Sequence, residues 1–313
     1  MNEKILKILI TGATGMVGKN LIEHESIKKF NILSPNSSEL NLLNYEEVHD
    51  YIANNLPDLI VHAAGKVGGI QDNMSNPVDF LVQNMDMGRN IILSAQSNGV
   101  KKLINLGSSC IYPKYAKNPI KEELLLTGEL ESTNEGYALA KILVMKLCEY
   151  IANEDSKFIF RTILPCNLYG KYDKFDPKHS HMVPAVIKKI HEAKEKQVYE
   201  IDIWGDGTAK REFMYAADFA DFLIFAIENI EKLPQNLNVG VGQDYSINEY
   251  YALIANLVGY KGKFTNDTSK PTGMQQKLID ISKLNDLGWR HSTSLESGLK
   301  KTYNYYLNEV IND

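Results

Sequence analysis

The feature that most constrains this chain is a glycine-rich turn directly after its first apolar run. Residues 7–10 are expected to form a buried strand, and Gly12, Gly15 and Gly18 follow it before a helical pattern that begins at Lys19. Glycines at this spacing between a strand and a helix let the backbone approach a pyrophosphate, which rests on the free N–H groups of the helix N-terminus. The same spacing could be a mere tight turn, but its position on the first strand predicts a dinucleotide site. The predicted cofactor contacts in this turn are Gly12, Thr14, Gly15, Met16 and Val17.

Further short apolar runs indicate the other strands of a doubly wound parallel α/β sheet. They lie at 30–33, 58–62, 101–106 and 158–164. Ligands of such sheets bind just beyond the carboxyl ends of the strands. Residues that follow these runs are therefore further candidate cofactor contacts: Ser37, Ala63, Ala64, Pro165, Asn167 and Leu168.

The loop after the second run, residues 34–38, bears on the choice between NAD and NADP. An acidic residue there would bind a free ribose 2′-hydroxyl, and an arginine would bind a 2′-phosphate. The loop reads Ser-Pro-Asn-Ser-Ser and contains neither. Room for a phosphate, with hydroxyl and amide donors beside it, favours NADP(H), and Leu42, Leu43 and Asn44 are expected beside the adenine.

A candidate catalytic centre lies at the end of the fourth run. Ser108 follows that strand, and Tyr137 and Lys141 are four residues apart, which places them on one face of a helix. A hydroxyl, a phenol and an ammonium at one point can polarise a carbonyl and transfer a proton. The lysine charge is expected to lower the pKa of the tyrosine. Tyrosine and lysine at this spacing are common in helices, so the catalytic interpretation depends on the glycine turn upstream.

Composition excludes several other classes of protein. A net charge of −5 over 313 residues argues against a general nucleic-acid binder, which carries a basic footprint. No apolar run approaches membrane-spanning length, and no signal peptide is evident. The cysteines, Cys110, Cys148 and Cys166, lack metal-ligand spacing, so we expect no metal and a reducing, cytoplasmic location.

After Gly170 the alternation of short apolar runs and helical patterns becomes less regular. We expect a dinucleotide-binding domain over residues 1–170, with a segment near 212–240 returning to it, and a mainly substrate-binding domain over 171–313.

Two single polar residues within the predicted elements also have predicted roles. His62, within an apolar strand, is expected to be structural. Asn84 is a candidate for a buried polar link between its helix and the sheet.

Several runs together resemble the GDP-L-fucose synthase family of the extended short-chain dehydrogenase/reductase superfamily. The most specific is Gly-Ser-Ser-Cys-Ile-Tyr-Pro at 107–113. The resemblance covers nearly the whole chain, and its other runs are at 62–70, 167–170, 204–208, 211–213 and 238–240.

The resemblance implies reduction of a GDP-4-keto-6-deoxy sugar with NADP(H), preceded in the fucose-forming members by epimerisation at C3 and C5. It implies that Ser108, Tyr137 and Lys141 form the reductase triad and that Cys110 and His181 are the epimerisation base and acid, with His181 also near the cofactor. Either a neighbouring imidazolium or the nicotinamide ring is expected to help ionise the thiol. The resemblance also implies a homodimer, formed through helices that include that of Tyr137. The implied nucleotide-sugar contacts are Ser109, Asn167, Lys188, Trp204, Arg211 and Lys277.

The sequence departs from the family pattern near both ligands. Thr14 and the 34–38 loop replace arginines near the cofactor, and Gly136 replaces a proline before the tyrosine. Near the sugar, Lys188, Thr272 and Gln276 replace an arginine, an aspartate and an arginine. These changes leave several alternatives open: a reductase of a 6-deoxy-heptose without epimerisation, a nucleotide-sugar 4-epimerase or 4,6-dehydratase, and a catalytically silent NADP sensor. Two further alternatives remain open: Cys110 could only fill space in the core, and Lys188 could be an ordinary surface lysine.

Overall fold

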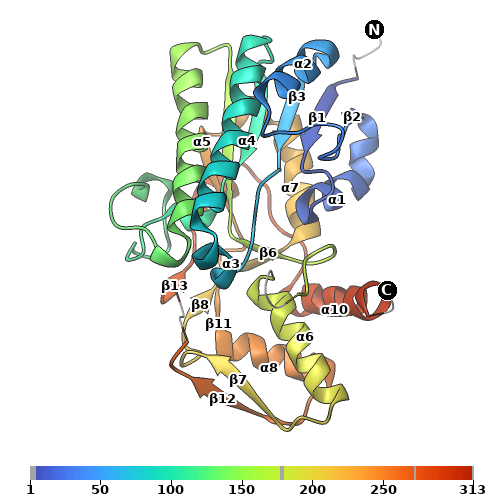
Figure 1. The fold of residues 1–313 in the computed structure, drawn as a ribbon, viewed down its shortest axis with the longest axis vertical. Helices are drawn as coiled ribbons and strands as arrows, with labels where there is room; N and C mark the ends of the chain where they lie inside the picture. The colour runs from blue at the N-terminus through green and yellow to red at the C-terminus, as the bar shows by residue number, and fades with distance from the viewer. Residues whose placement is uncertain (1–4, 177–179, 271–272, 312–313) are drawn as a thin grey trace.

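A large α/β layer carries a smaller, mixed α/β layer at one end of the molecule (Figure 1). The computed structural model describes residues 5–176, 180–270 and 273–311. Within these residues, no helix combines the length and the apolar character needed to cross a membrane.

The large layer is built on a six-stranded parallel sheet with the strand order β10-β5-β4-β3-β1-β2. Strands β1, β3, β4 and β5 contain nearly continuous buried residues, most of them apolar, as expected for a sheet covered on both faces. The order reverses beside β1, which opens a ligand crevice beyond the carboxyl ends of the strands. The strands are β1 (Lys7–Thr11), β2 (Asn31–Leu33), β3 (Leu59–His62), β4 (Lys102–Leu106), β5 (Ile159–Pro165) and β10 (Asn236–Val239).

Helices cover both faces of this sheet, which confirms the predicted doubly wound fold. Strand side chains alternate between two apolar clusters. Leu9 and Leu103 pack toward α2 (Tyr45–Asn55), α4 (Pro77–Ser97) and α5 (Glu135–Glu154). Ile8 and Ile104 pack toward α1 (Met16–Glu23) and α7 (Ala216–Glu228) on the other face. Period-two alternation in each strand therefore builds two cores from one sheet.

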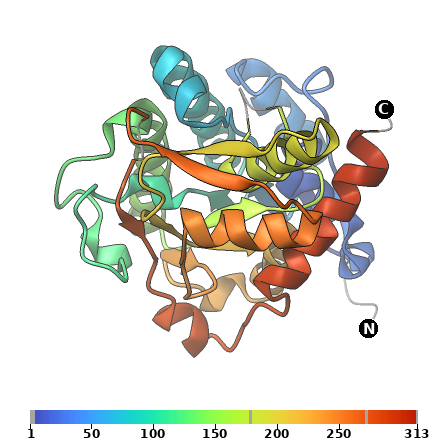
Figure 2. The same cartoon turned by 90° about the horizontal axis from the view of Figure 1, so that it is seen from below.

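The smaller layer has an apolar cluster of its own. Val183 and Ile187 of α6 pack with Ile201 of β7 and with Tyr250 and Ile254 of α8. Figure 2 shows this layer from below, with α8 and α10 at the front. Its elements are α6 (Met182–Glu195), β7 (Glu200–Trp204), β8 (Lys210–Arg211), β11 (Tyr245–Ser246), α8 (Ile247–Val258), β12 (Lys263–Asp267), β13 (Gln276–Lys277) and α10 (Leu295–Tyr305).

Short elements connect the two layers. The parallel pair β6 and β9 joins the end of β5 to the segment that enters α7. The remaining elements are η1 (Glu25–Lys29), α3 (Ile70–Ser75), η2 (Ser109–Ile111), η3 (Glu122–Leu124), η4 (Ser132–Asn134), β6 (Asn167–Tyr169), β9 (Phe213–Tyr215), η5 (Ile230–Lys232), α9 (Ser282–Asp286) and the final turn Tyr306–Val310.

The two polar residues singled out in the sequence are buried and hydrogen-bonded. His62 is buried at the end of β3, where its Nδ1 lies 2.8 Å from the Thr11 hydroxyl. Burial, together with the charge of Lys141, lowers the pKa of His62 to about 3, so the ring is neutral and structural, as predicted. Asn84 accepts from the Lys66 N–H at 2.9 Å and donates to the Lys66 carbonyl at 3.0 Å. It therefore links α4 to the loop that leaves β3.

Candidate active site

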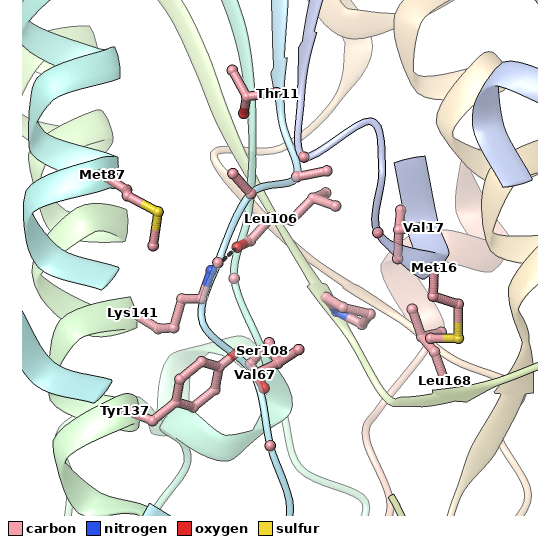
Figure 3. A pocket seen from close by; sticks show the side chains of 18 of the residues that line it. Thr11, Met16, Val17, Val67, Met87, Leu106, Ser108, Tyr137, Lys141 and Leu168 are labelled. Carbon is pink, nitrogen blue, oxygen red and sulfur yellow. Dashed lines mark hydrogen bonds between the residues drawn. The ribbon is translucent and has the colours of Figure 1, made fainter. Parts of the chain in front are cut away.

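A cavity of about 500 Å³ lies beyond the carboxyl ends of the sheet strands (Figure 3). The glycine turn, the segments that follow β2 to β5, and α5 all contribute to its walls. Apart from Asn44, which was expected beside the adenine, every cofactor contact predicted from the sequence lines this cavity. These residues are Gly12, Thr14, Gly15, Met16, Val17, Ser37, Ala63, Ala64, Lys141, Pro165, Asn167, Leu168 and His181.

The glycine turn is shaped for a close backbone approach. Gly12 has φ +73°, and a Cβ on it would lie 2.6 Å from the Ala64 nitrogen. Gly15 is the N-cap of α1, and no side chain caps that helix end. The free N–H groups at the start of α1 can therefore donate hydrogen bonds to an anionic group. The turn and the adjoining cavity fit the pyrophosphate of a dinucleotide.

The segment after β2 supplies only neutral donors to the cavity. Asn36 and Ser37 line it, but the Asn36 amide oxygen already accepts from the Ser38 and Glu39 backbones. The Glu39 carboxylate accepts from the Asn36 N–H at 2.9 Å. An acidic group thus lies one residue beyond the predicted loop, already satisfied by the backbone. Leu42 and Leu43 line the cavity as expected, whereas Asn44 serves as the N-cap of α2.

The three predicted reductase residues converge on one wall of the cavity. Ser108 follows β4 and accepts from the Cys110 N–H at 3.2 Å. Tyr137 and Lys141 project from successive turns of α5, and the Tyr137 ring points toward Ser108 (Figure 3). The Lys141 ammonium donates to the Leu106 carbonyl at 2.9 Å and lies 5.8 Å from the Tyr137 ring centre. Serine, tyrosine and lysine therefore meet at the end of β4.

Burial sets the protonation of the phenol and the amine. It raises the pKa of Tyr137; the nearby Cys110 adds to this rise, and a hydrogen bond with Ser108 opposes it. Burial also lowers the pKa of Lys141 to about 8. The expected lowering of the tyrosine pKa by the lysine is therefore wrong for this structure, because removal of the phenolate from water dominates. The phenol keeps its proton at neutral pH, as a proton donor requires.

The predicted epimerisation pair also lines the cavity. Cys110 lies on η2, and His181 immediately precedes α6. Burial, followed by the charges of Lys277 and Lys174, lowers the pKa of His181 to about 4, so its imidazole is neutral at neutral pH. A neighbouring imidazolium is consequently not what ionises the thiol. Among the described residues, no group of three or more His, Cys, Asp or Glu side chains could hold a metal ion.

The predicted nucleotide-sugar contacts are distributed unevenly around the cavity. Asn167 lines it and donates to the Glu212 carbonyl at 2.8 Å. Ser109 is buried and, in the part of the chain that is described, lies outside the lining. The other four contacts belong to the smaller layer and also lie outside the lining: Lys188, Trp204, Arg211 and Lys277.

Lys188 and Trp204 each have a charged neighbour within the smaller layer. The Lys188 ammonium lies 3.7 Å from the Glu192 carboxylate on α6, in a partly exposed pair. Trp204 ends β7, and the Lys270 ammonium lies 5.9 Å from its ring centre.

Two departures from the family pattern have a structural account. A Cβ on Gly136 would lie 2.7 Å from the Pro77 carbonyl oxygen, so glycine lets the start of α5 approach the start of α4. Gln276 donates to the Asp244 carboxylate at 2.7 Å, which ties β13 to the loop before β11. Thr272 lies outside the described residues.

Sequence reasoning missed several residues of the cavity wall. Val67, Asn73, Met87, Asn134 and Phe219 line it without having been predicted. The sequence held a signal for one of them: Met87 lies three residues after the buried Asn84, and therefore on the same face of α4. The others come from the loop after β3 and from α3, η4 and α7, whose approach to the cavity depends on tertiary packing.

Fold and site together define a class. A doubly wound sheet with a glycine-rich first turn, and a serine, tyrosine and lysine triad at the end of β4, is the architecture of an extended short-chain dehydrogenase/reductase.

Comparison with known proteins narrows this class. Residues 8–241 match the NAD dependent epimerase/dehydratase family. The chain is 57% identical to GDP-L-colitose synthase of Yersinia pseudotuberculosis, over 98% of this chain and 100% of that protein. It is 49% identical to GDP-L-fucose synthase of Azorhizobium caulinodans, over 97% and 98% of the two chains. The solved structure of MlghC, a GDP-mannoheptose C4 reductase from Campylobacter jejuni with NADP bound, superposes with a TM-score of 0.87 at 33% identity, covering 97% and 99%. The chain belongs to the GDP-L-fucose synthase family.

Proposed function

We propose that this protein is an NADP(H)-dependent oxidoreductase that reduces the C4 ketone of a GDP-linked 4-keto-6-deoxy sugar. The observation that carries this proposal is the convergence of Ser108, Tyr137 and Lys141 on the dinucleotide cavity at the end of β4. The family relationship supplies the class of substrate, since relatives are named for GDP-L-fucose, GDP-L-colitose and a GDP-heptose.

The triad residues prepare the ketone for reduction. Ser108 donates a hydrogen bond to the C4 oxygen and polarises the carbonyl. Tyr137, which stays protonated because it is buried, delivers its proton to that oxygen as negative charge develops. Lys141 favours the phenolate left behind. The bound NADPH supplies the hydride, and the glycine turn, Ala63 and Ala64 orient it.

Cys110 and His181 are proposed to epimerise the sugar before reduction. A C4 ketone acidifies the hydrogens on C3 and C5, so a base can remove one and leave an enolate. The hydroxyl donors that polarise the ketone for hydride attack also stabilise this enolate. Both side chains line the cavity that holds Ser108 and Tyr137, which supports the assignment of base and acid to this pair.

The nucleotide end of the substrate is assigned to the smaller layer. We propose that Asn167, Lys188, Trp204 and Arg211 contact it, with Ser109 beside the sugar; only the family resemblance adds Lys277 to these contacts. Residues 1–170 then form the dinucleotide-binding domain, with the segment near 212–240 returning to its sheet, and residues 171–313 form most of the substrate-binding domain. The return of β10 to the edge of β5 supports this division.

The protein is proposed to be a homodimer that assembles through α4 and α5. These helices lie side by side on one outer face of the molecule (Figure 1). They expose apolar side chains at helical spacing, with Val78 and Val82 on α4 and Leu139 and Leu143 on α5. Such a stripe is typical of an interface.

We propose a cytoplasmic location for the protein. Its free thiols, Cys110, Cys148 and Cys166, support a reducing environment.

A GDP-4-keto-6-deoxy-heptose is the second candidate substrate. A further cavity of about 260 Å³ shares Asn73, Asn134 and Tyr137 with the main cavity. It provides room beside the phenol for a substituent larger than a methyl group.

The 4,6-dehydratase alternative is disfavoured by the residues beside the serine. Cys110 and Ile111 follow Ser109 on η2 and supply no acidic side chain there.

NADPH oxidation with a panel of GDP-4-keto sugars tests the reductase proposal. The panel contains precursors of GDP-L-fucose and GDP-L-colitose together with a 6-deoxy-heptose. We expect consumption of NADPH with at least one of them, and Tyr137→Phe should slow turnover by about 10²–10⁴-fold while NADPH still binds. A 4-epimerase would convert its sugar without net oxidation, and a silent sensor would bind NADPH without turnover. A Phe variant with near-wild-type turnover would contradict the role of Tyr137.

Deuterium incorporation tests the epimerase proposal separately. In heavy water we expect deuterium at C3, C5 or both in the product, abolished by Cys110→Ser and strongly reduced by His181→Asn. Reduction of an already epimerised ketone should survive both changes, since the triad is intact. Wild-type product without deuterium at either carbon would leave a plain 4-reductase.

A further inference from the structure

Two cations from one pair of strands lie near the Cys110 thiol. The Lys277 ammonium is 3.6 Å from the Cys110 sulfur. β13 pairs in parallel with β8, and this register sets Lys277 beside Arg211. The Lys277 side chain is only 8% exposed and does not belong to the described lining of the dinucleotide cavity. Lys277 is thus in direct contact with the sulfur.

We propose that Lys277 is a positioning residue that keeps the Cys110 sulfur as a thiolate, and that it is not a contact to the substrate diphosphate. The proposal rests on the assignment of Cys110 as the epimerisation base. It reassigns a residue that the family resemblance placed among the nucleotide contacts. The short distance to the sulfur, the burial of the ammonium and the strand register each support it.

The surroundings of the thiol explain why an ammonium is needed there. Burial alone raises the pKa of a thiol. For Cys110 the charge of Lys277 opposes burial, with help from a Ser108 hydrogen bond and from Arg211, and the pKa falls below its usual value. Cys148, buried between helix and sheet, has its pKa raised by burial to about 12. Cys166 also has its pKa raised by burial, to which the nearby Glu212 adds.

The other titratable groups around the thiol do not supply this charge. Tyr137 on α5 is a neutral phenol whose pKa burial raises, and His181 before α6 is a neutral imidazole. Arg211 interacts with both the Cys110 sulfur and Glu131, and its charge lowers the pKa of the thiol less than that of Lys277 does.

The proton balance of the step follows from this arrangement. The thiol proton passes to solvent before the substrate binds, so the sulfur is ready to accept a proton. On attack the C–H bond next to the ketone breaks and an S–H bond forms. The electron pair moves onto the C4 oxygen as an enolate. The neutral His181 imidazole takes up a proton from solvent and passes it to the carbon from the other face, and the proton on the sulfur then returns to solvent.

Alkylation of the thiol tests the role of Lys277 without any sugar. Iodoacetamide reacts with the thiolate, so the rate at Cys110, followed by peptide mass spectrometry across pH, reports its ionisation. We expect wild-type Cys110 to react with a midpoint below about 8.5, the value of an ordinary thiol. Lys277→Met should raise this midpoint by at least about one pH unit, which slows the reaction about tenfold at neutral pH. Lys277→Arg should restore most of the rate.

Arg211→Met is the matched control, because it removes a cation from the paired strand. It should change the alkylation midpoint much less than Lys277→Met, while weakening the binding of free GDP by about tenfold or more. Lys277→Met should leave GDP binding within about twofold of wild type. NADPH binding by each variant verifies that it is folded, and Lys277→Arg provides a second comparison if the methionine variant is not.

The outcomes separate this proposal from the proposed function. Superimposable alkylation profiles for wild type and Lys277→Met would overturn it, as would a loss of GDP affinity equal to that of Arg211→Met. A shifted profile in an enzyme that incorporates no deuterium would support the role of Lys277 and contradict epimerisation alone. Deuterium incorporation with an unshifted profile would contradict the role of Lys277 alone.

Discussion

Replacing Gly12 by alanine should destabilise the fold and weaken dinucleotide binding together. The new Cβ would lie 2.6 Å from the Ala64 nitrogen and 2.7 Å from the Ala63 carbonyl carbon, both of them backbone atoms. The φ of +73° at Gly12 costs a residue with a side chain roughly 1–2 kcal/mol. Overpacking typically adds about 1–3 kcal/mol. We therefore expect Gly12→Ala to lower the free energy of unfolding by about 2–5 kcal/mol. NADPH affinity should fall as well, because relief of the contact displaces Ala63 and Ala64 in the cavity wall.

Gly259 provides the matched control within the same chain. It has φ +78° at the end of α8, and nothing lies within 4 Å of the Cβ that alanine would add. Gly259→Ala should therefore carry only the conformational cost of roughly 1–2 kcal/mol and leave NADPH binding unchanged. Urea unfolding and a fluorescence titration with NADPH measure both quantities. The reasoning is refuted if Gly12→Ala costs no more than Gly259→Ala and binds NADPH normally.

Three further predictions follow from particular contacts. NADPH should bind more tightly than NADH by a modest margin, because neutral donors near Ser37 contribute about 0.5–1.5 kcal/mol per net hydrogen bond; titration of both cofactors measures this, and tighter NADH binding would contradict it. The folded-state pKa of His62 is depressed, so the stability that its neutral ring contributes is present above pH 6.5 and lost as the pH falls toward 3. In urea unfolding across this range His62 should add a slope of up to about 1.4 kcal/mol per pH unit, and an equal slope in His62→Gln would exclude it as the source. Leu143→Glu on the exposed face of α5 should shift the protein toward monomers in sedimentation, whereas Lys261→Glu, between α8 and β12 of the smaller layer, should not.

Much of the large layer could be predicted because its determinants are local. The first five strands of the parallel sheet are short apolar runs, and each is followed by residues that are typical of a turn or of a helix start. The glycine turn carries its own function, since the spacing that bends the chain also creates the anion site. Tyr137 and Lys141 share a helix face, so their convergence follows from helical geometry alone.

The electrostatics of the site could not be predicted in the same way. The raised pKa of Tyr137 depends on burial, which is decided by segments far from it in sequence. Lys277 meets Cys110 across a separation of 167 residues, where a bridge between Ile120 and Ile279 holds the two segments side by side. The Glu39 carboxylate lies just outside the loop that was expected to decide cofactor choice, and it is held by a backbone N–H. Distance in the chain, rather than residue type, concealed the surroundings of Tyr137 and Lys277, whereas Glu39 lies three residues from Asn36 and was missed because the loop was taken to end at residue 38.

The position of β10 at the edge of the sheet affects how the protein is made on the ribosome. β10 covers one side of β5, yet it is synthesised only after the chain from Cys166 to Gln235 has emerged. At about 5–20 residues per second, β5 waits roughly 4–14 seconds with one row of backbone N–H and C=O groups unpaired. An uncovered edge of this kind invites pairing with another chain. Nascent chains halted before residue 236 should therefore be more prone to aggregation, and more dependent on chaperones, than chains halted beyond 239.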